Sequence, residues 1–357
     1  MSEIKTEAIN VTPTTQSRLA EVDINDVPFG KVFSDHMLIV TCKNGEWQTP
    51  EIKPFGAIEM HPAMSVIHYG QSIFEGMKAY KNVHGEVMLF RPEDNFNRFN
   101  ESARRMCMTE VPREIFMDGL LELIRLDSNW IPTKEGSSLY IRPVMFATDE
   151  YVGIKPSDDY CFMIFTCPVG AYYPEPITVK IEEEYVRAAE GGVGAAKAAG
   201  NYAASLYPNK KAMEEGYRQL LWTDAKEHKY IEESGTMNVF FVIGDKLITP
   251  GTSRDTILKG ITRRSVITLA NDMGLTVEER PVEVAEVVDA LKSGSLKEAF
   301  GAGTAATIAH ISAIGYRGNR FELPPISERK IGNALLDQLT NIRLGLVEDK
   351  YGWVVKP

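Results

Sequence analysis

The chain has 357 residues, of which 44% are hydrophobic and 25% charged, and its formal net charge at pH 7 is −10. This length predicts two domains, each large enough to bury its own core. The acidic balance, without a Lys/Arg-rich stripe, argues against a nucleic-acid partner, and no apolar run approaches the roughly 20 residues that span a bilayer.

The first segment, residues 1–23, is polar and carries acidic side chains. It has neither the apolar core of a secretory signal nor the Arg-rich, acid-poor composition of a transit peptide. We therefore expect a cytoplasmic protein.

The N-terminal half mixes strands and helices. Alternating and β-rich runs predict strands over residues 36–47, 86–92, 137–149 and 160–170, and apolar spacing of helical period predicts helices over 95–108 and 113–130. Cys161 and Cys167 share the last of these strands and are interpreted as small core residues, because no metal-ligand or redox spacing joins the cysteines or histidines. No metal site is expected.

The C-terminal half begins after a proline-containing segment, residues 170–178, which we interpret as an interdomain linker between domains 1–169 and 179–357. Helices are predicted over 203–216, 261–274, 283–294 and 327–345, with Pro208 as a start, break or kink of the first. Strands are predicted over 218–224, 229–234, 238–250 with a turn at Gly244-Asp245, 276–282 and 298–312. This mixed order indicates an α+β or mixed α/β fold, and not a regular βαβ dinucleotide unit.

One lysine stands alone among small residues in the segment GGVGAAKAAGNY, residues 191–202. Between Gly194 and Gly200, Lys197 is the only residue with a side chain larger than a methyl group. Such neighbours leave room for a planar group against the backbone, and a lysine that loses hydration there favours its neutral, nucleophilic amine. The alternative is a flexible Gly/Ala loop with a solvated lysine.

Three further segments offer groups that a pyridoxal phosphate enzyme needs. Glu233, at a predicted strand end, can pair with a protonated pyridine nitrogen. Its neighbour Glu232 faces the other way in a strand and is interpreted as a surface acid, a reading also open for Glu233. Gly260 precedes a helix whose first N–H groups, at Ile261 and Thr262, suit a phosphate.

Two alternatives remain for the small and basic residues around these groups. Arg263 and Arg264 belong to the candidate phosphate site, or they are ordinary surface charges at the start of a helix. Gly301 and Gly303 permit close backbone approach, with the Thr304 hydroxyl beside them, or they belong to a close-packed structural strand.

Together these motifs carry a family likeness. The chain resembles the class IV, fold-type IV pyridoxal phosphate aminotransferases, and most closely the branched-chain amino acid aminotransferases. The motifs that carry the resemblance are VPFGKVFSDHML, HYGQSIFEGMKAY, LFRPEDNFNRFN, SLYIRP, CPVGAYYP, GGVGAAKAAGNY, EESGTMNVFF and FGAGTAA. The resemblance implies a two-domain fold like that of D-amino acid aminotransferase, with the cofactor at the domain interface, and a homodimer.

The resemblance also implies roles for individual residues. Lys197 corresponds to the catalytic lysine that forms a Schiff base with pyridoxal 5′-phosphate and then moves protons. The implied cofactor-binding residues are Arg98, Ile261, Thr262 and Thr304 at the phosphate, Tyr202 at the ring hydroxyl and Glu233 at the ring nitrogen. The implied substrate-binding residues are Phe29, Phe74, Tyr140, Arg142, Tyr172, Thr236, Thr304 and Ala305, with Tyr69 and Ile154 reaching in from a second subunit.

The expected reaction is reversible, ping-pong amino transfer between leucine, isoleucine or valine and 2-oxoglutarate, in branched-chain amino acid biosynthesis. A D-amino acid aminotransferase and an aminodeoxychorismate lyase of the same fold remain alternatives, as does a binding protein that has lost its chemistry. Mammalian branched-chain members carry a CxxC redox switch where this chain has Ala306 and Ala309, so that form of regulation is not expected here.

Overall fold

The computed structural model describes residues 9–170 and 175–357, which divide by their contacts into two units. Unit 1 holds the described residues up to 170 together with Ala196–Ala199 and Ile342–Pro357, and unit 2 holds 175–195 and Gly200–Asn341. Both units are discontinuous in sequence, whereas the sequence led us to expect continuous domains. Among the described residues, no helix has the length and apolar character needed to cross a membrane.

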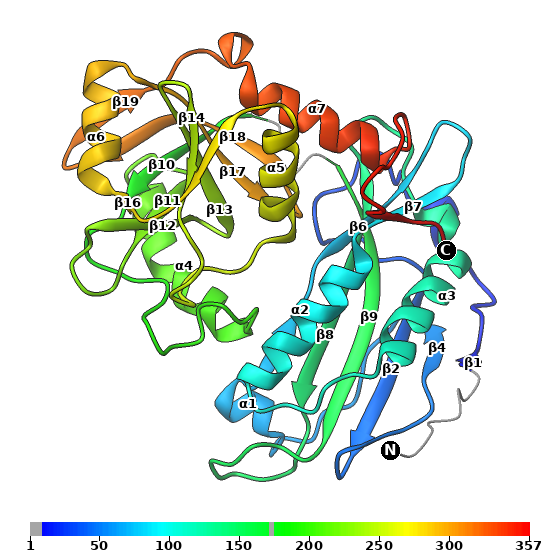
Figure 1. Ribbon diagram of the computed structural model, residues 1–357. Coiled ribbons are helices and arrows are strands. Elements are labelled where there is room, and N and C mark those ends of the chain that lie inside the picture. The colour runs from blue at the N-terminus through cyan, green and yellow to red at the C-terminus, as the bar shows by residue number, and fades with distance from the viewer. Residues whose placement is uncertain (1–8, 171–174) are drawn as a thin grey trace. The chain divides into compact units, whose positions relative to one another are not determined.

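Unit 1 is built on a ten-stranded sheet whose main path runs β1-β4-β2-β9-β8-β6-β7-β20 (Figure 1). Its strands are β1 (Asn10–Val11), β2 (His36–Lys43), β3 (Glu46–Trp47), β4 (Glu51–Pro54), β5 (Ser72–Phe74), β6 (Met77–Lys81), β7 (Val87–Phe90), β8 (Ser138–Ala147), β9 (Tyr160–Val169) and β20 (Val354–Val355). Its helices are η1 (Leu19–Glu21), α1 (Ser65–Tyr69), α2 (Pro92–Arg105), the π-helix η2 (Glu114–Asp118), α3 (Gly119–Leu126) and η3 (Ser128–Trp130). β8 and β9 pair antiparallel along their full length, Ser138 with Val169 through Ala147 with Tyr160.

The core of unit 1 forms where α2 and α3 pack against this sheet (Figure 1). Helix α2 begins with proline at its first turn and has acidic residues there and arginines in its last turn, which suits the helix dipole. Its buried face brings Phe99 against Phe116 and Phe162, with ring centroids 5.6 and 5.4 Å away. The three rings are fully buried.

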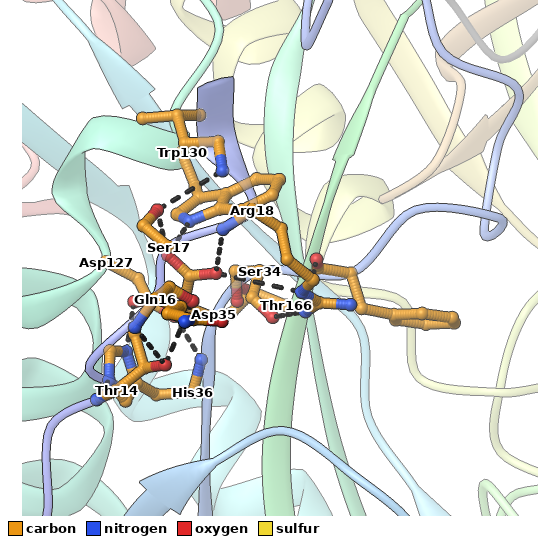
Figure 2. A network of polar contacts seen from close by, with 12 residues as sticks. Thr14, Gln16, Ser17, Arg18, Ser34, Asp35, His36, Asp127, Trp130 and Thr166 are labelled. Atoms are coloured by element: carbon orange, nitrogen blue, oxygen red, sulfur yellow. Dashed lines mark hydrogen bonds and ion pairs between the residues drawn. The ribbon is translucent and has the colours of Figure 1, made fainter. Parts of the chain in front are cut away.

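A polar network fixes residues 14–18 to the edge of this core (Figure 2). The Oδ2 atom of Asp35 accepts hydrogen bonds from the Ser17 hydroxyl at 2.5 Å and the Trp130 Nε1 at 2.9 Å, and its Oδ1 accepts the Arg18 N–H at 3.0 Å. Beside it, His36 Nδ1 lies 2.6 Å from Asp127 Oδ1. Asp35 accepts hydrogen bonds from three donors, and Asp127 contacts both the N–H and the ring of His36, whose Nε2 accepts the Thr14 N–H. Hydrogen bonds as well as apolar contacts therefore hold the N-terminal segment.

Unit 2 is a second ten-stranded sheet that closes on itself, because β12 pairs with β13 in addition to β11. Its strands are β10 (Ile177–Ile181), β11 (Gln219–Thr223), β12 (Tyr230–Ser234), β13 (Met237–Ile243), β14 (Lys246–Thr249), β15 (Thr276–Glu279), β16 (Val282–Glu283), β17 (Leu296–Gly303), β18 (Thr307–Tyr316) and β19 (Asn319–Glu322). Its helices are α4 (Ala199–Glu214), α5 (Ile261–Asp272), α6 (Val284–Ser293), η4 (Ile326–Glu328) and α7 (Ile331–Arg343), whose last two residues belong to unit 1. The closure makes β13-β17-β18-β10-β11-β12 a barrel around a buried apolar core.

Most predicted elements are confirmed, with three differences. The predicted strand 298–312 is two antiparallel strands, β17 and β18, joined by a turn at 304–306. The predicted helix 113–130 is a π-helix, an α-helix and a short 3₁₀ turn in succession. Pro208 lies inside α4 and neither starts nor ends it. Cys161 and Cys167 are buried free thiols, as expected for core residues, and burial raises the pKa of each to about 11.

We predict that Asp35→Asn destabilises the protein by about 1–3 kcal/mol. Both oxygens of Asp35 accept hydrogen bonds, and the amide NH₂ group that replaces one of them cannot accept. Urea unfolding followed by circular dichroism measures the loss. Asp26→Asn, at an exposed position of the same N-terminal region, is the control and should change stability little. Equal midpoints for the two variants would contradict the structural role of Asp35.

Candidate active site

Lys197 belongs to a four-residue segment of unit 1 that is held through its backbone. The Lys197 N–H donates to the Ser102 hydroxyl of α2 at 2.9 Å, and the Lys197 carbonyl accepts the Phe74 N–H at 3.1 Å. Ala198 forms a β-bridge with Ile73 of β5. The lysine is therefore fixed on both sides by a strand and a helix, and it does not lie in a free Gly/Ala loop.

The Lys197 side chain lies over an aromatic and basic cluster of the same unit. Its Nζ is 4.9 Å from the centroid of the Phe74 ring, and the Arg142 guanidinium lies 4.5 Å from that same centroid. Arg142 Nη2 donates to the Tyr140 hydroxyl at 2.9 Å, and Phe29 packs edge-on against Tyr140 at 5.2 Å. Unit 1 thus brings together the lysine and four of the residues expected to form the substrate pocket.

A buried ion pair lies directly beside this cluster. Glu75 is fully buried, and its two oxygens accept Arg98 Nε at 2.7 Å and Arg98 Nη2 at 2.9 Å, while Asn95 Nδ2 donates at 2.7 Å. Burial raises the pKa of Glu75, but the charge and hydrogen bonds of Arg98, with Lys197 and Asn95, bring it below its ordinary value. The arginine expected to hold the phosphate is therefore oriented by a carboxylate.

In unit 2, Glu233 lies near the end of β12 and is buried. Its Oε1 accepts Asn238 Nδ2 at 3.1 Å and the Leu258 N–H at 3.1 Å, and its Oε2 lies 2.7 Å from Arg187 Nε. Glu232, interpreted from the sequence as a surface acid, is buried too, and that interpretation is wrong. Burial raises the pKa of Glu232, although Thr256 and Arg187 act in the opposite direction.

The N-terminus of α5 presents backbone donors next to Glu233. Gly260 is its N-cap and provides no side-chain cap, while Ile261 and Thr262 in the first turn are buried. A Cβ at position 260 would overlap Asn238 Oδ1, the amide that also holds Glu233, so glycine is required by close packing. Arg263 is not a surface charge, because its side chain is buried and donates to the Pro250 carbonyl and Glu279, both at 2.8 Å.

Some glycines of the two glycine-rich segments pack closely against the protein itself, whereas Gly191 and Gly200 face open space. A Cβ at Gly194 would overlap Ala188 and the Thr256 carbonyl. A Cβ at Gly301 would lie 2.6 Å from the Met237 methyl carbon, which supports the structural reading of that strand. The expectation that small residues around Lys197 leave an open hole therefore does not hold at Gly194.

The other expected site residues are distributed as follows. In unit 2, Tyr202 lies half-buried on α4, Thr236 is exposed in the β12–β13 turn, and Thr304 and Ala305 are half-buried in the turn between β17 and β18. In unit 1, Tyr69 on α1 and Ile154 are exposed, 44% and 93% respectively. Tyr172 lies outside the described residues.

Four residues that the sequence analysis did not assign are central to these clusters: Glu75, Ser102, Arg187 and Asn238. Glu75 and Asn238 lie within motifs that carry the family resemblance, so the sequence could have indicated both as candidate site residues. Arg187 precedes Lys197 by ten positions in a segment with no motif, and no pattern in the sequence singles it out.

Comparison with known proteins places the chain in a family. The model of the class IV amino-transferase family matches residues 72–314. Branched-chain-amino-acid aminotransferase 2 of Bacillus subtilis is 42% identical over 346 residues, covering 96% of this chain and 95% of that protein. A probable branched-chain-amino-acid aminotransferase of Staphylococcus epidermidis is 45% identical over 339 residues, covering 94% of each.

Solved structures agree in fold. The branched-chain aminotransferase from Thermoproteus uzoniensis, determined with norvaline, superposes with a TM-score of 0.74 at 25% identity, covering 90% of this chain and 99% of that one.

We predict that Glu75→Gln destabilises the protein by about 3–5 kcal/mol, because it leaves the Arg98 guanidinium buried without its counter-charge. The pKa of Glu75 is lowered in the folded state, so its contribution to stability is present above the unfolded pKa and is lost as pH falls through the folded pKa. Urea unfolding at a series of pH values should show that the free energy of unfolding of the parent falls at acid pH, and that the fall is smaller in the variant.

The matched control is Glu93→Gln, which breaks the exposed pair of Glu93 with Arg113. Such pairs contribute about 0–1 kcal/mol. If Glu75→Gln were as mild as Glu93→Gln, the buried pair would not be the stabilising contact that we infer.

Proposed function

Because the chain belongs to the class IV aminotransferase family, we propose that it transfers the amino group between branched-chain L-amino acids and 2-oxoglutarate, with pyridoxal phosphate as cofactor. The observation that carries the proposal is the position of Lys197, whose backbone is clamped while its amine lies over Phe74 beside Arg142 and Tyr140. Relatives at 42% and 45% identity that bear the name branched-chain aminotransferase support the substrate class.

The residues present suit the cofactor chemically. The uncapped first turn of α5 fits a phosphate dianion, and the buried carboxyl group of Glu233 fits a protonated ring nitrogen. When bound, pyridoxal phosphate supplies an electron sink that makes the substrate Cα–H acidic. Lys197 would bind the cofactor through its amine and then move the proton between Cα and the cofactor.

The other residues would bind and orient. Arg98, held by Glu75, and the N–H groups of Ile261 and Thr262 would fix the phosphate, with the Thr304 hydroxyl. Tyr202 would donate to the ring hydroxyl. Thr304 and Ala305 would receive the substrate carboxylate in the turn between β17 and β18.

The substrate side chain would meet mostly apolar and aromatic groups, which suits leucine, isoleucine and valine. Arg142, with the Tyr140 hydroxyl, would bind the γ-carboxylate when glutamate or 2-oxoglutarate occupies the same pocket. Because one pocket would serve both substrates in turn, ping-pong kinetics are expected. The exposed Tyr69 and Ile154 are proposed to complete the pocket of a second copy in a homodimer, and the enzyme to act in the cytoplasm in branched-chain amino acid biosynthesis.

The direct test is spectroscopic. The purified protein loaded with pyridoxal phosphate should be yellow, and its visible band should shift on addition of L-leucine or L-isoleucine. Lys197→Ala should still bind the cofactor but show no transamination, whereas Lys210→Ala, at an exposed position, should behave as the parent. A shift with D-alanine and none with L-leucine would contradict the substrate assignment, and a protein that stays colourless with added cofactor would contradict the reaction.

We predict that Arg142→Met separates the two substrates. Loss of a charge-assisted hydrogen bond of about 2 kcal/mol should lower kcat/KM for L-glutamate roughly 30-fold, with a much smaller effect for L-leucine, whose side chain carries no charge. Steady-state rates with each amino donor measure this. Tyr140→Phe keeps the ring and removes the hydroxyl, so it should show a weaker form of the same preference; equal losses for both donors would exclude γ-carboxylate binding by Arg142.

A further inference from the structure

Arg187 connects three separate segments of unit 2. It lies in the irregular stretch between β10 and α4, and its side chain is only 9% exposed. Its Nε is 2.7 Å from Glu233 Oε2, and its Nη2 donates to the Gly194 carbonyl at 3.0 Å and to the Thr256 carbonyl. One guanidinium therefore contacts the end of β12, the glycine segment before Lys197 and the loop before α5.

Hydrogen-bond donors lie at one oxygen of the Glu233 carboxylate and a cation lies at the other. Asn238 Nδ2 and the Leu258 N–H approach Oε1, while the guanidinium approaches Oε2. A carboxylate buried to this degree takes up a proton unless charge and hydrogen bonds stabilise its ionised form. The donors around Glu233 supply that stabilisation.

We propose that Arg187 is a positioning residue that, together with Asn238, keeps Glu233 ionised. Glu233 is then a weaker base than the ring nitrogen of bound pyridoxal phosphate, and the ring nitrogen carries the proton. This inference rests on the proposed function, in which Glu233 pairs with that nitrogen. Arg187 itself would touch neither substrate nor cofactor.

The sign of the effect follows from distance. The Arg187 cation lies 2.7 Å from a Glu233 oxygen and would lie farther from the ring nitrogen. Its charge therefore disfavours a proton on Glu233 more strongly than a proton on the ring nitrogen. Removing the charge therefore moves the shared proton from the ring nitrogen toward Glu233 and weakens the cofactor as an electron sink. Glu232 belongs to the same charged environment, and a negative charge there would act against Arg187 by favouring a proton on Glu233.

Arg187 also has a structural role, since its bonds to two carbonyls tie loops together. Two variants separate charge from these bonds. Arg187→Gln removes the charge, whereas Arg187→Lys keeps a cation but cannot reproduce the guanidinium fork that reaches Glu233 and both carbonyls.

The experiment loads each protein with pyridoxal phosphate labelled with ¹⁵N in the ring and records the ring ¹⁵N chemical shift against pH. We expect a protonated ring nitrogen in the parent and in Arg187→Lys, and a shift toward the neutral value in Arg187→Gln. The rate of the half-reaction with L-leucine should fall about tenfold or more in Arg187→Gln and recover in part in Arg187→Lys. Arg317→Gln, which breaks an exposed pair with Glu183, is the control and should leave the ring signal unchanged.

Each outcome decides the inference. A ring nitrogen that stays protonated in Arg187→Gln, or that is neutral in both Arg187 variants, would overturn it. If Arg187→Gln does not fold, as judged by thermal unfolding of the apoprotein, Asn238→Ala replaces it: a smaller shift toward the neutral value supports the inference, and no shift overturns it. A parent protein that binds no cofactor, or whose ring signal is unaffected by Glu233→Gln, would instead contradict the proposed function.

Discussion

Removing a carboxylate from water costs several kcal/mol unless charge and hydrogen bonds compensate, and this constraint shapes both units. In unit 1, Glu75 is buried and takes two bonds from Arg98. In unit 2, Glu233 is buried against Arg187. Each pair lies next to a residue expected to meet the cofactor, so the energetic demand of the buried acid also fixes the geometry of the predicted site.

The same pairs connect elements that are distant in sequence. Arg98 on α2 reaches Glu75 in the loop between β5 and β6, directly after the strand that carries Phe74 and the bridge to the Lys197 segment. Arg187 joins Glu233 to the glycine segment before Lys197 and to the loop before α5. A change in one of these side chains therefore propagates to backbone segments that carry several functional groups, and effects at neighbouring positions are not expected to add.

The sequence predicts local structure well, because hydrophobic period reports which face of a strand or helix is buried. It places Glu233 at a strand end and the start of α5 at Ile261, as the structure does. It misses the turn at 304–306, where small residues continue the β-like pattern through a reversal of direction. It also misreads Glu232 as a surface acid and leaves a surface charge open for Arg263, because nothing in a local pattern shows which distant partner compensates a buried ion. The partners of Glu75 and Glu233 lie 23 and 46 positions away, and only the folded chain brings them together.

The pairing of β20 with β7 has a consequence for how the protein is made. Val354 lies opposite Phe90, and Trp353 packs edge-on against the same phenylalanine, so the sheet of unit 1 is completed by residues synthesised after all of unit 2. At ribosomal speeds of about 5–20 residues per second, the roughly 260 residues between these strands take on the order of tens of seconds to emerge. During that interval β7 is an unpaired sheet edge, which is the kind of surface that chaperones cover and that nascent chains use to associate wrongly.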